Sequence, residues 1–350
     1  YNKDSGGKYA EYFTPHAVAK IMAACLVTDD VNNVTCYDPS AGSGTLLMNL
    51  AHAIGEDKCT IYSQDISQKS SSLLRLNLIL NNLVHSIQNI IQGNTIQHPY
   101  HKQENGQLEK FDYIVSNPPF KLDFSDYSAD LDTKANNERF FAGIPNVPKK
   151  DKDGMAIYVL FLQHIMHSLK QNGKAAIVVP MGFITAQTGV EKKIREKMVA
   201  DKILAGVVNM PPNIFATTNA NVSIIFLDSN NKNDGIVLID ASNLGDIIKE
   251  DNNQKTVLTS DEEHLIIKTF NEKNAIKDFS VVVSYDDIKA KNYSLNAGQF
   301  FEVIINHNHI TKEEFTNNLK CFKADLDTLF IESKDLENEI NKNLKALSFE

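Results

Sequence analysis

The stretch from Phe111 to Phe120 begins with strand-forming residues and stops at Pro118 and Pro119, which cannot donate to a sheet ladder. Asn117 lies directly before the prolines, and an aromatic ring follows them. In an open α/β sheet, ligands bind beyond the carboxyl ends of the strands. An amide that accepts hydrogen bonds and a ring that stacks on a flat group are therefore predicted at a binding edge.

A second candidate site is the loop after a predicted strand at residues 34–37. Its residues are Asp38, Pro39, Ser40, Ala41, Gly42, Gly44, Thr45 and Leu46, and a helix follows through residue 53. The two glycines let the backbone approach a ligand closely. A dinucleotide would bring a pyrophosphate to the helix N-terminus, whereas the acid at the strand end favours a ligand with a cationic amino group.

Polar side chains also follow the next two predicted strands. A strand at residues 59–63 leads to Asp65 and Ile66, about 20 residues beyond the glycines, where an acid usually binds ribose hydroxyls. A strand at residues 87–91 is followed by Asn94, which either bonds an adenine edge or forms a turn with the preceding glycine. The sequence leaves both interpretations of Asn94 open.

Near the N-terminus, a short polar and aromatic segment precedes a helical pattern that runs to Leu26. The segment consists of Glu11, Tyr12, Phe13, Thr14 and Pro15. Threonine is a favoured helix N-cap and proline a favoured first helical residue. The sequence therefore predicts a helix that is capped by the Thr14 side chain.

Strands that alternate with helices predict a doubly wound, mostly parallel α/β sheet. The later predicted elements are a helix at 154–170, a strand at 173–180, a helix near 190–199 and strands near 203–208 and 222–227. We expect the last two strands to form an antiparallel hairpin and to complete the sheet. We expect residues 1–305 to form this domain and residues 306–350 to form a separate helical segment.

Two further stretches have unusual patterns. Residues 121–150 are polar and long for a connection, and such loops are often functional. Arg139, Phe140, Phe141, Lys149 and Lys150 suit an element over a nucleic-acid groove, and a solvated excursion is an equal alternative.

Along residues 310–349, apolar residues recur at spacings of three and four, which predicts a long helix with a heptad seam. The seam consists of Phe315, Leu319, Phe322, Leu326, Leu329, Leu336, Ile340, Leu344 and Leu347, and Ser333 interrupts it. So much apolar surface predicts packing on the helix's own domain or, more often, on a partner helix.

The composition, with 42% hydrophobic and 23% charged residues, is that of a soluble globular protein. No apolar run can span a bilayer, and the four cysteines lack any C-x-x-C pair, so we expect a cytoplasmic protein with reduced thiols and no membrane contact. The scattered histidines predict no metal site. A net charge of −9 is unfavourable for binding DNA phosphates, so either a basic patch or a partner would have to supply that contact.

Asn117-Pro118-Pro119-Phe120 resembles the (Asn/Asp/Ser)-Pro-Pro-aromatic motif of the amino-group DNA methyltransferases. The segment from Tyr12 to Pro15 resembles the first cofactor-binding motif of adenine-specific members. These two segments, the glycine loop and Asp65 follow one another along the chain in the order typical of this family: the N-terminal segment, the loop, the acid and then the Asn-Pro-Pro-Phe motif. The chain is therefore similar to the modification (M) subunit of type I restriction–modification systems over roughly residues 9–301. Typical M subunits also have an N-terminal helical region, which is missing from this sequence.

This resemblance implies S-adenosylmethionine as the cofactor, bound by the residues given above from Glu11 to Asn94, with its amino-acid end near Thr14. It implies that Asn117 and Pro118 accept hydrogen bonds from the N6 amine of a flipped-out adenine while Phe120 stacks on the ring. Phe215, in the loop at 211–219, is either a second wall of that base pocket or a buried loop anchor. The implied partners are DNA and a specificity (S) subunit docked through the C-terminal helix, with a restriction (R) subunit as a further candidate.

Competing interpretations remain. N4-cytosine methylation uses similar chemistry, although serine more often replaces the asparagine. RNA or protein-glutamine methylation uses a related motif, but the Tyr-Phe-Thr-Pro segment argues against both. A catalytically silent scaffold with the same fold would differ in cofactor binding, which the intact acids and glycines predict. The incomplete glycine fingerprint disfavours a nicotinamide dehydrogenase.

Overall fold

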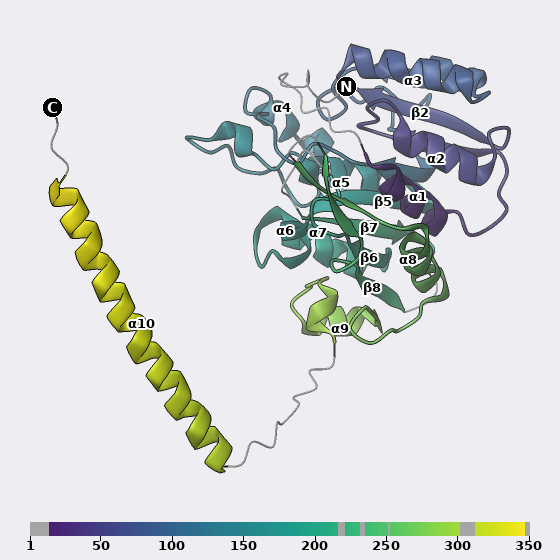
Figure 1. Cartoon of the computed structure of the whole chain (residues 1–350). Coiled ribbons are helices and arrows are strands. Elements are labelled where there is room, and N and C mark those ends of the chain that lie inside the picture. The colour runs from purple at the N-terminus through teal and green to yellow at the C-terminus, as the bar shows by residue number, and fades with distance from the viewer. Residues whose placement is uncertain (1–13, 216–220, 232–234, 251–252, 302–311, 347–350) are drawn as a thin grey trace. The chain divides into compact units, whose positions relative to one another are not determined.

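The computed structural model describes residues 14–215, 221–231, 235–250, 253–301 and 312–346 (Figure 1). The chain divides into two compact units, Tyr1–Phe301 and Glu302–Glu350. The first unit contains a sheet with helices on both faces. The described part of the second unit is one long helix, α10 (Lys312–Ala346).

Nine of the described strands form one sheet in the order β11-β8-β6-β7-β5-β4-β1-β2-β3. They are β1 (Val34–Asp38), β2 (Cys59–Asp65), β3 (Ile90–Gln92), β4 (Phe111–Ser116), β5 (Leu169–Pro180), β6 (Leu204–Asn209), β7 (Val222–Asp228), β8 (Ile236–Asp240) and β11 (Ser280–Val283). Neighbours among β1 to β5 pair in parallel, as do β6 and β8. The strand β7 is antiparallel to β5 and β6, and β11 is antiparallel to β8. The predicted mostly parallel sheet and its late antiparallel hairpin are therefore confirmed.

The order of the strands reverses at β1, because β2 and β3 lie on one side of it and β4 and β5 on the other. Such a switch point leaves a crevice between the loops that follow the two central strands. Asp38 is the last residue of β1, and Asn117 directly follows β4. The two main candidate segments of the sequence therefore meet at the switch point.

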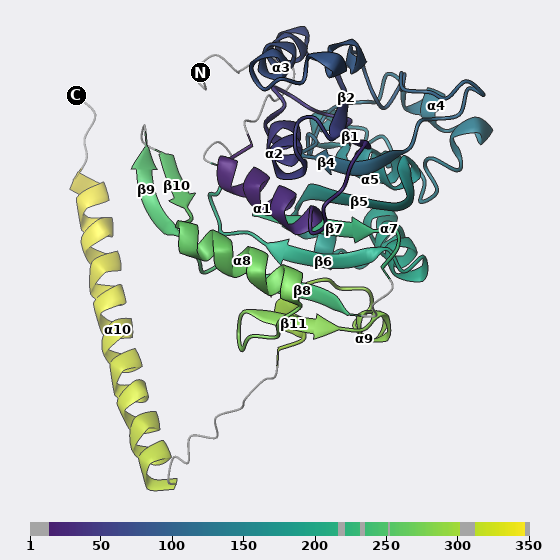
Figure 2. The ribbon, with the colours of Figure 1, turned by 90° about the vertical axis from the view of Figure 1, so that its right-hand side faces the viewer.

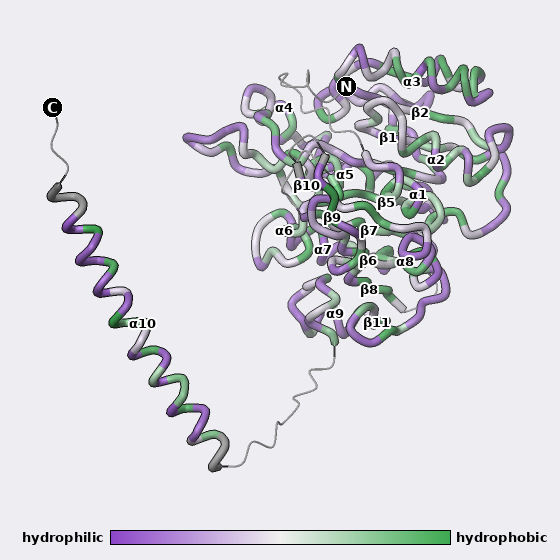
Figure 3. Tube along the Cα trace, in the orientation of Figure 1, coloured by the Kyte–Doolittle hydropathy of each residue, from purple (hydrophilic) through white to green (hydrophobic). Residues whose placement is uncertain are grey.

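Helices cover both faces of the sheet (Figures 1 and 2). One face packs against α1 (His16–Leu26), α2 (Thr45–Ile54), α3 (Gln68–Leu80) and α8 (Ser260–Glu272), and the other against α5 (Tyr158–His167), α6 (Met181–Thr185), α7 (Gly189–Ala200) and α9 (Tyr285–Ala290). Strands covered on both faces have nearly continuous apolar runs, as in Ala175–Val179, which is buried throughout. Figure 3 shows the hydrophobic residues concentrated on these central strands.

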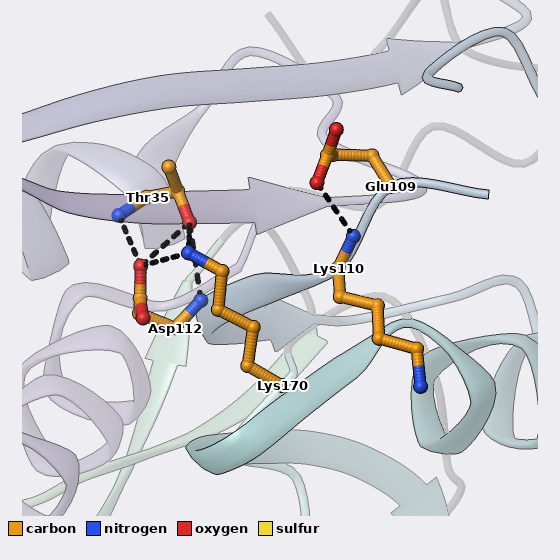
Figure 4. A network of polar contacts seen from close by, with 5 residues as sticks. All are labelled: Thr35, Glu109, Lys110, Asp112 and Lys170. Atoms are coloured by element: carbon orange, nitrogen blue, oxygen red, sulfur yellow. Dashed lines mark hydrogen bonds and ion pairs between the residues drawn. The ribbon is translucent and has the colours of Figure 1, made fainter. Parts of the chain in front are cut away.

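A polar network ties three strands together at the opposite, amino-terminal edge of the sheet (Figure 4). Asp112 of β4 accepts hydrogen bonds from the backbone and hydroxyl of Thr35 in β1, and from Lys170 of β5 at 2.8 Å. Burial alone would raise the pKa of the Asp112 carboxyl, but the bonds from Lys170 and Thr35 outweigh burial and lower it. This network fixes the strands far from the switch point and is structural.

The strand prediction was incomplete after β7. The described residues add β8 and β11 to the sheet, and a separate two-stranded ribbon of β9 (Asp246–Glu250) and β10 (Asn253–Val257). The third strand is also shorter than predicted. A 3-10 turn, η1 (Val84–Asn89), occupies most of the predicted strand and buries the Ser86 hydroxyl, which accepts a hydrogen bond from the Ile61 amide. The strand β3 therefore begins only at Ile90.

The helix predicted at 154–170 was placed too widely, since α5 begins at Tyr158 and ends at His167. Leu169 instead pairs with Phe111 in the sheet and begins β5. The side chain of Leu169 is buried, as the helical pattern required. Its backbone is extended and pairs with β4 instead of continuing α5.

Residues 121–150 are anchored by a few buried side chains, although many of their residues are exposed. They contain α4 (Ser128–Leu131) and a small core in which Phe124, Leu131 and Phe140 are buried. These side chains pack with residues 155–161 at the start of α5. The prediction of a nucleic-acid element is therefore wrong for the aromatic Phe140, while Lys149 and Lys150 are exposed.

The predicted long C-terminal helix is confirmed as α10. The described seam residues, from Phe315 to Ile340, are each more than half exposed. The side chains of Leu344 and Leu347 lie outside the described residues. The use of the seam for docking stays a prediction.

Candidate functional site

Three predicted segments meet at the carboxyl ends of the parallel strands. The loop after β1, the end of β2 at Asp65 and the Asn117 segment after β4 all belong to neighbouring strands. The remaining N-terminal segment enters through Thr14 and Pro15, while Glu11, Tyr12 and Phe13 lie outside the described residues.

Asp38 is the buried acid of the site, with 1% of its surface exposed. Its carboxylate accepts a hydrogen bond of 2.9 Å from the Ser40 amide, and the Ser40 hydroxyl lies 2.7 Å from that of Ser116. Burial raises the pKa of Asp38 to about 7, the Ser40 and Ser116 hydrogen bonds lower it, and the charge of Asp65 raises it. A cation at this carboxyl would therefore displace a proton near neutral pH.

The carboxylate of Asp65 organises the glycine loop. It accepts a hydrogen bond of 2.8 Å from the Gly42 amide and another of 2.8 Å from the Ser67 amide at the start of α3. The structure thus brings Asp65 to the glycine loop. Whether Asp65 also binds a ribose stays a prediction, and so does the role of its neighbour Ile66, which is 38% exposed.

The two loop glycines are required for different reasons. Gly42 and Gly44 have positive φ angles of +53° and +87°, which L side chains rarely adopt. A Cβ on Gly44 would lie 2.2 Å from Leu74 Cδ1, whereas one on Gly42 would meet nothing within 4 Å. Gly44 therefore serves close packing of the loop on α3, and Gly42 leaves open space above the backbone.

The remaining predicted residues of the loop after β1 are mostly part of the fold's packing. Leu46 and Ala41 are buried apolar side chains, and Leu46 begins the apolar face of α2. The Pro39 carbonyl accepts a hydrogen bond of 2.7 Å from the Thr95 hydroxyl. The Ala41 and Leu46 side chains therefore belong to the core and the Pro39 carbonyl to the loop's own packing, while Thr45 is partly exposed.

Asn94 forms the turn that the sequence left as an alternative. Its side-chain oxygen accepts hydrogen bonds of 3.0 Å and 3.2 Å from the Ile96 and Gln97 amides. The oxygen is therefore committed to the turn, and the Nδ2 group is the part of the side chain suited to a ligand.

Asn117 is contacted by the N-terminal segment. Its Nδ2 group donates a hydrogen bond of 3.1 Å to the Thr14 hydroxyl. The prediction that Thr14 caps the first helix is wrong, because α1 begins at His16, Pro15 occupies the N-cap position, and no side chain caps it. The Thr14 hydroxyl bonds the candidate catalytic amide instead.

Phe120 lies at the meeting point of the two main cores. Its partly buried ring stands edge-on to Tyr158, with ring centroids 6.2 Å apart. Pro118 is buried and Pro119 partly buried beside it. Phe215 is 6% exposed and packs in the core on the α1 side of the sheet, which supports the loop-anchor interpretation, and its role in a base pocket stays a prediction.

Arg139 is a buried cation beside the Asn94 turn, whereas the sequence predicted it over a nucleic-acid groove. Arg139 is 3% exposed and donates hydrogen bonds to the carbonyls of Thr95 and Ile96, both at 2.8 Å, and to His164 Nδ1 at 3.1 Å. The prediction of Arg139 over a nucleic-acid groove is therefore wrong. Its side chain holds the Asn94 turn against α5.

The same contacts fix the protonation of His164. Because the guanidinium can only donate, Nδ1 must accept, so Nε2 carries the proton and donates to the Tyr37 hydroxyl at 3.2 Å. Burial, followed by the charge of Arg139, lowers the pKa of His164 well below its usual value. The histidine is thus neutral and structural. Arg139 lies in a loop, and the residues around it in the sequence form no pattern that would indicate this network.

Within the described residues, no group of three or more His, Cys, Asp or Glu side chains is placed to hold a metal ion. No helix of the described part of the chain is long and apolar enough to cross a bilayer.

Comparisons with known proteins agree with this geometry. Residues 1–309 match the family described as N-6 DNA Methylase. The chain is 30% identical over 349 residues to the type I restriction enzyme MpnII methylase subunit of Mycoplasma pneumoniae, covering 97% of this chain and 60% of that protein. It is 27% identical to the type I restriction enzyme MjaIX methylase subunit of Methanocaldococcus jannaschii, covering 98% and 60%.

The crystal structure of a type I restriction-modification system methyltransferase subunit from Streptococcus thermophilus has a similar fold. The TM-score is 0.69 at 27% identity, and the match covers 84% of this chain and 60% of that one. This likeness confirms the predicted methyltransferase-like sheet. The chain spans about 60% of the length of these relatives. Since the family match extends over most of the sequence, the chain belongs to the N-6 DNA methylase family.

Proposed function

We propose that this chain transfers a methyl group from S-adenosylmethionine to the N6 amine of an adenine flipped out of DNA, as the modification subunit of a type I restriction–modification system. The observation that carries the proposal is the position of Asn117, directly after β4, at the switch point beside the buried acid Asp38. Family membership supports it.

The residues present fit the cofactor. Asp38 is buried and has a raised pKa, so an ammonium group would compensate a charge that burial disfavours. Gly42 leaves open space above the backbone. S-adenosylmethionine, when bound, supplies an electrophilic methyl group whose leaving group is a neutral thioether. The Asp65 carboxylate would reach the ribose while holding the Gly42 amide.

The Asn-Pro-Pro-Phe segment would act on the base. Extruding an adenine costs about a few kcal/mol in lost stacking and pairing. Stacking of the base on Phe120 offsets part of this cost. The Asn117 side-chain oxygen and the Pro118 carbonyl would accept hydrogen bonds from the two amine hydrogens. These bonds would aim the nitrogen lone pair at the methyl carbon. After transfer, the methylated amine would release one proton to solvent water.

Positioning supplies most of the rate enhancement in this scheme, because the electrophile is already activated. The stiff turn at the prolines and the edge-on contact of Phe120 with Tyr158 keep the acceptors and the ring in place.

We infer that sequence recognition lies in a partner. The net charge of −9 is unfavourable for a lone DNA reader. The exposed seam of α10 from Phe315 to Ile340 would dock helices of a specificity subunit, and a restriction subunit would join the same assembly in the cytoplasm. Sequence-specific methylation by the purified chain alone would contradict this division of labour.

The first test is calorimetric titration of S-adenosylmethionine into the full chain, the Asp38→Ala variant and the control Asp57→Ala, an exposed turn acid. We expect binding by the wild type and the control, and none by Asp38→Ala. No binding by the wild type, with or without a candidate specificity subunit, would favour the silent-scaffold alternative.

The second test is digestion of methylated DNA to nucleosides. We expect N6-methyladenine, and none from the Asn117→Ala variant. N4-methylcytosine in the product would instead select the cytosine alternative.

A further inference from the structure

Thr14 directly precedes Pro15, the N-cap residue of α1, yet its hydroxyl does not cap that helix. The residue is 8% exposed, and its Oγ1 lies 3.1 Å from the Nδ2 group of Asn117, which is 103 residues away in the chain. Threonine at a helix start ordinarily caps the first turn. Here the Pro15 carbonyl accepts from the Ala19 amide and starts the helix, which leaves the hydroxyl directed at the candidate catalytic amide.

An asparagine side chain has two different ends. Its oxygen accepts hydrogen bonds, and its NH2 group donates them. The proposed reaction needs the oxygen toward the adenine amine, because a donor facing the amine hydrogens would repel them. A 180° rotation of the amide exchanges the two ends at little steric cost. When the oxygen faces the amine, the Nδ2 group faces the other way and needs an acceptor of its own.

We infer that Thr14 is that acceptor: its hydroxyl takes the hydrogen bond of Nδ2 and so stabilises the orientation in which the Asn117 oxygen faces the target amine. This inference rests on the proposed function. A proline follows each of the two residues that form this hydrogen bond, and a proline disfavours helical geometry at the residue before it. Pro15 restricts Thr14 in this way, and Pro118 restricts Asn117. Thr14 is thus a positioning residue for the base, in addition to its expected place near the cofactor.

The test compares two substitutions of the full chain, assayed with the partner subunits that its activity requires. Thr14→Val keeps the shape and methyl group but removes the hydroxyl, and Thr14→Ser keeps the hydroxyl but removes the methyl group. We expect Thr14→Val to lower kcat by about 10- to 100-fold, as for one lost hydrogen bond at the reacting centre. Thr14→Ser should retain kcat within about threefold. The reverse order would show that Thr14 matters through packing alone and would overturn the inference.

A cofactor role predicts a different result. If Thr14 served only the cofactor, Thr14→Val would weaken calorimetric S-adenosylmethionine binding, and saturating cofactor would restore kcat. We expect the dissociation constant to change by less than about threefold and kcat to stay low at saturation. A second background separates orientation from other effects, since the carboxylate of Asn117→Asp has two equivalent acceptors. In that background, Thr14→Val should change kcat by less than about threefold, and a full 10- to 100-fold loss would overturn the inference.

A readout without activity separates failure of the inference from failure of the proposed function. The side-chain amide of Asn117 gives a pair of NMR signals, assigned by their loss in Asn117→Asp. We expect these signals to shift and their hydrogens to exchange faster with water in Thr14→Val, but not in Thr14→Ser. Unchanged signals in Thr14→Val would overturn the inference even if the wild type methylates DNA. Changed signals in a chain that methylates nothing, even with its partner subunits, would support the hydrogen bond and contradict the proposed function.

Discussion

The hydroxyl oxygens of Ser40 and Ser116 lie 2.7 Å apart, although 76 residues separate them in the sequence. This contact joins the loop after β1 to the last residue of β4, and both serines bond the Asp38 carboxyl. The candidate cofactor loop and the candidate catalytic strand therefore share one buried hydrogen-bond network. Its charge state depends on pH near neutrality.

Cofactor binding should strengthen as pH rises through about 7. The pKa of Asp38 is raised to about 7 by burial, so the carboxyl is largely protonated at pH 6 and cannot pair with an ammonium group. Below the pKa, we expect the affinity for S-adenosylmethionine to fall by up to about tenfold per pH unit. Titration calorimetry between pH 5.5 and 8.5 measures this, and affinity independent of pH would contradict it.

Removal of the Ser116 hydroxyl should move that pH profile. Because its hydrogen bond lowers the pKa of Asp38, Ser116→Ala should raise the pKa and shift the binding midpoint to higher pH. The matched control is Ser168→Ala, because the Ser168 hydroxyl is equally buried but has no hydrogen-bond partner among the described residues. Equal profiles for the two variants would exclude Ser116 from the network.

When no cofactor is bound, the Asp38 carboxylate should lower the free energy of unfolding above neutral pH. A carboxyl whose pKa is raised by folding binds a proton more tightly in the folded state, so its stabilising contribution is full below about pH 4 and is lost as pH rises through about 7. We expect Asp38→Asn to increase the free energy of unfolding at pH 8 by about 1–4 kcal/mol, and to leave it nearly unchanged at pH 4. Urea denaturation at both pH values measures the difference.

The control for this effect is Asp112→Asn at the other edge of the sheet. The pKa of Asp112 is lowered in the fold, so its carboxylate stabilises the protein above the ordinary aspartate pKa. The substitution should therefore lower the free energy of unfolding at pH 8, and the loss should shrink as pH falls. The same sign for both variants would contradict the assigned pKa directions.

Substitution of the two loop glycines should distinguish the packing role of Gly44 from the space that Gly42 leaves for a ligand. Gly44→Ala should destabilise the protein by about 3 kcal/mol, because the strained φ adds to the clash with Leu74. Gly42→Ala should cost about 1 kcal/mol for its φ alone, while it obstructs the cofactor. In a Leu74→Ala background the cost of Gly44→Ala should fall to about 1 kcal/mol. Thermal unfolding of the four variants decides this, and an unchanged cost would show that Leu74 is not the obstacle.

Loss of Arg139 should act on the fold rather than on DNA contact. Arg139→Met leaves two carbonyls and His164 Nδ1 without their donor, and we expect a loss of about 2–3 kcal/mol in the free energy of unfolding. As a control, Lys149→Met replaces an exposed side chain and should change the free energy of unfolding by less than about 0.5 kcal/mol. Wild-type stability with weaker DNA binding in Arg139→Met would restore the groove interpretation.

The sequence by itself determined where the strands end and which side chains stand there. Proline, glycine and the apolar period of two or 3.6 residues are local signals, so Asp38, Asp65 and Asn117 could be placed at strand ends from neighbouring residues alone. The helical seam of α10 was readable for the same reason. The alternation of strands and helices indicated a mostly parallel sheet, whereas the strand order, and with it the switch point at β1, came from the structure.

Only the tertiary structure decided which partner each polar group chose. Thr14 bonds Asn117 rather than its own helix, Arg139 points inward rather than toward DNA, and Leu169 joins a strand rather than prolonging α5. In each case the local preference was real, but a partner far along the chain offered a buried hydrogen bond. An unpaired buried polar group costs about 1–3 kcal/mol, which exceeds most local propensities. The long-range partner therefore decided these positions, and local sequence carries no record of it.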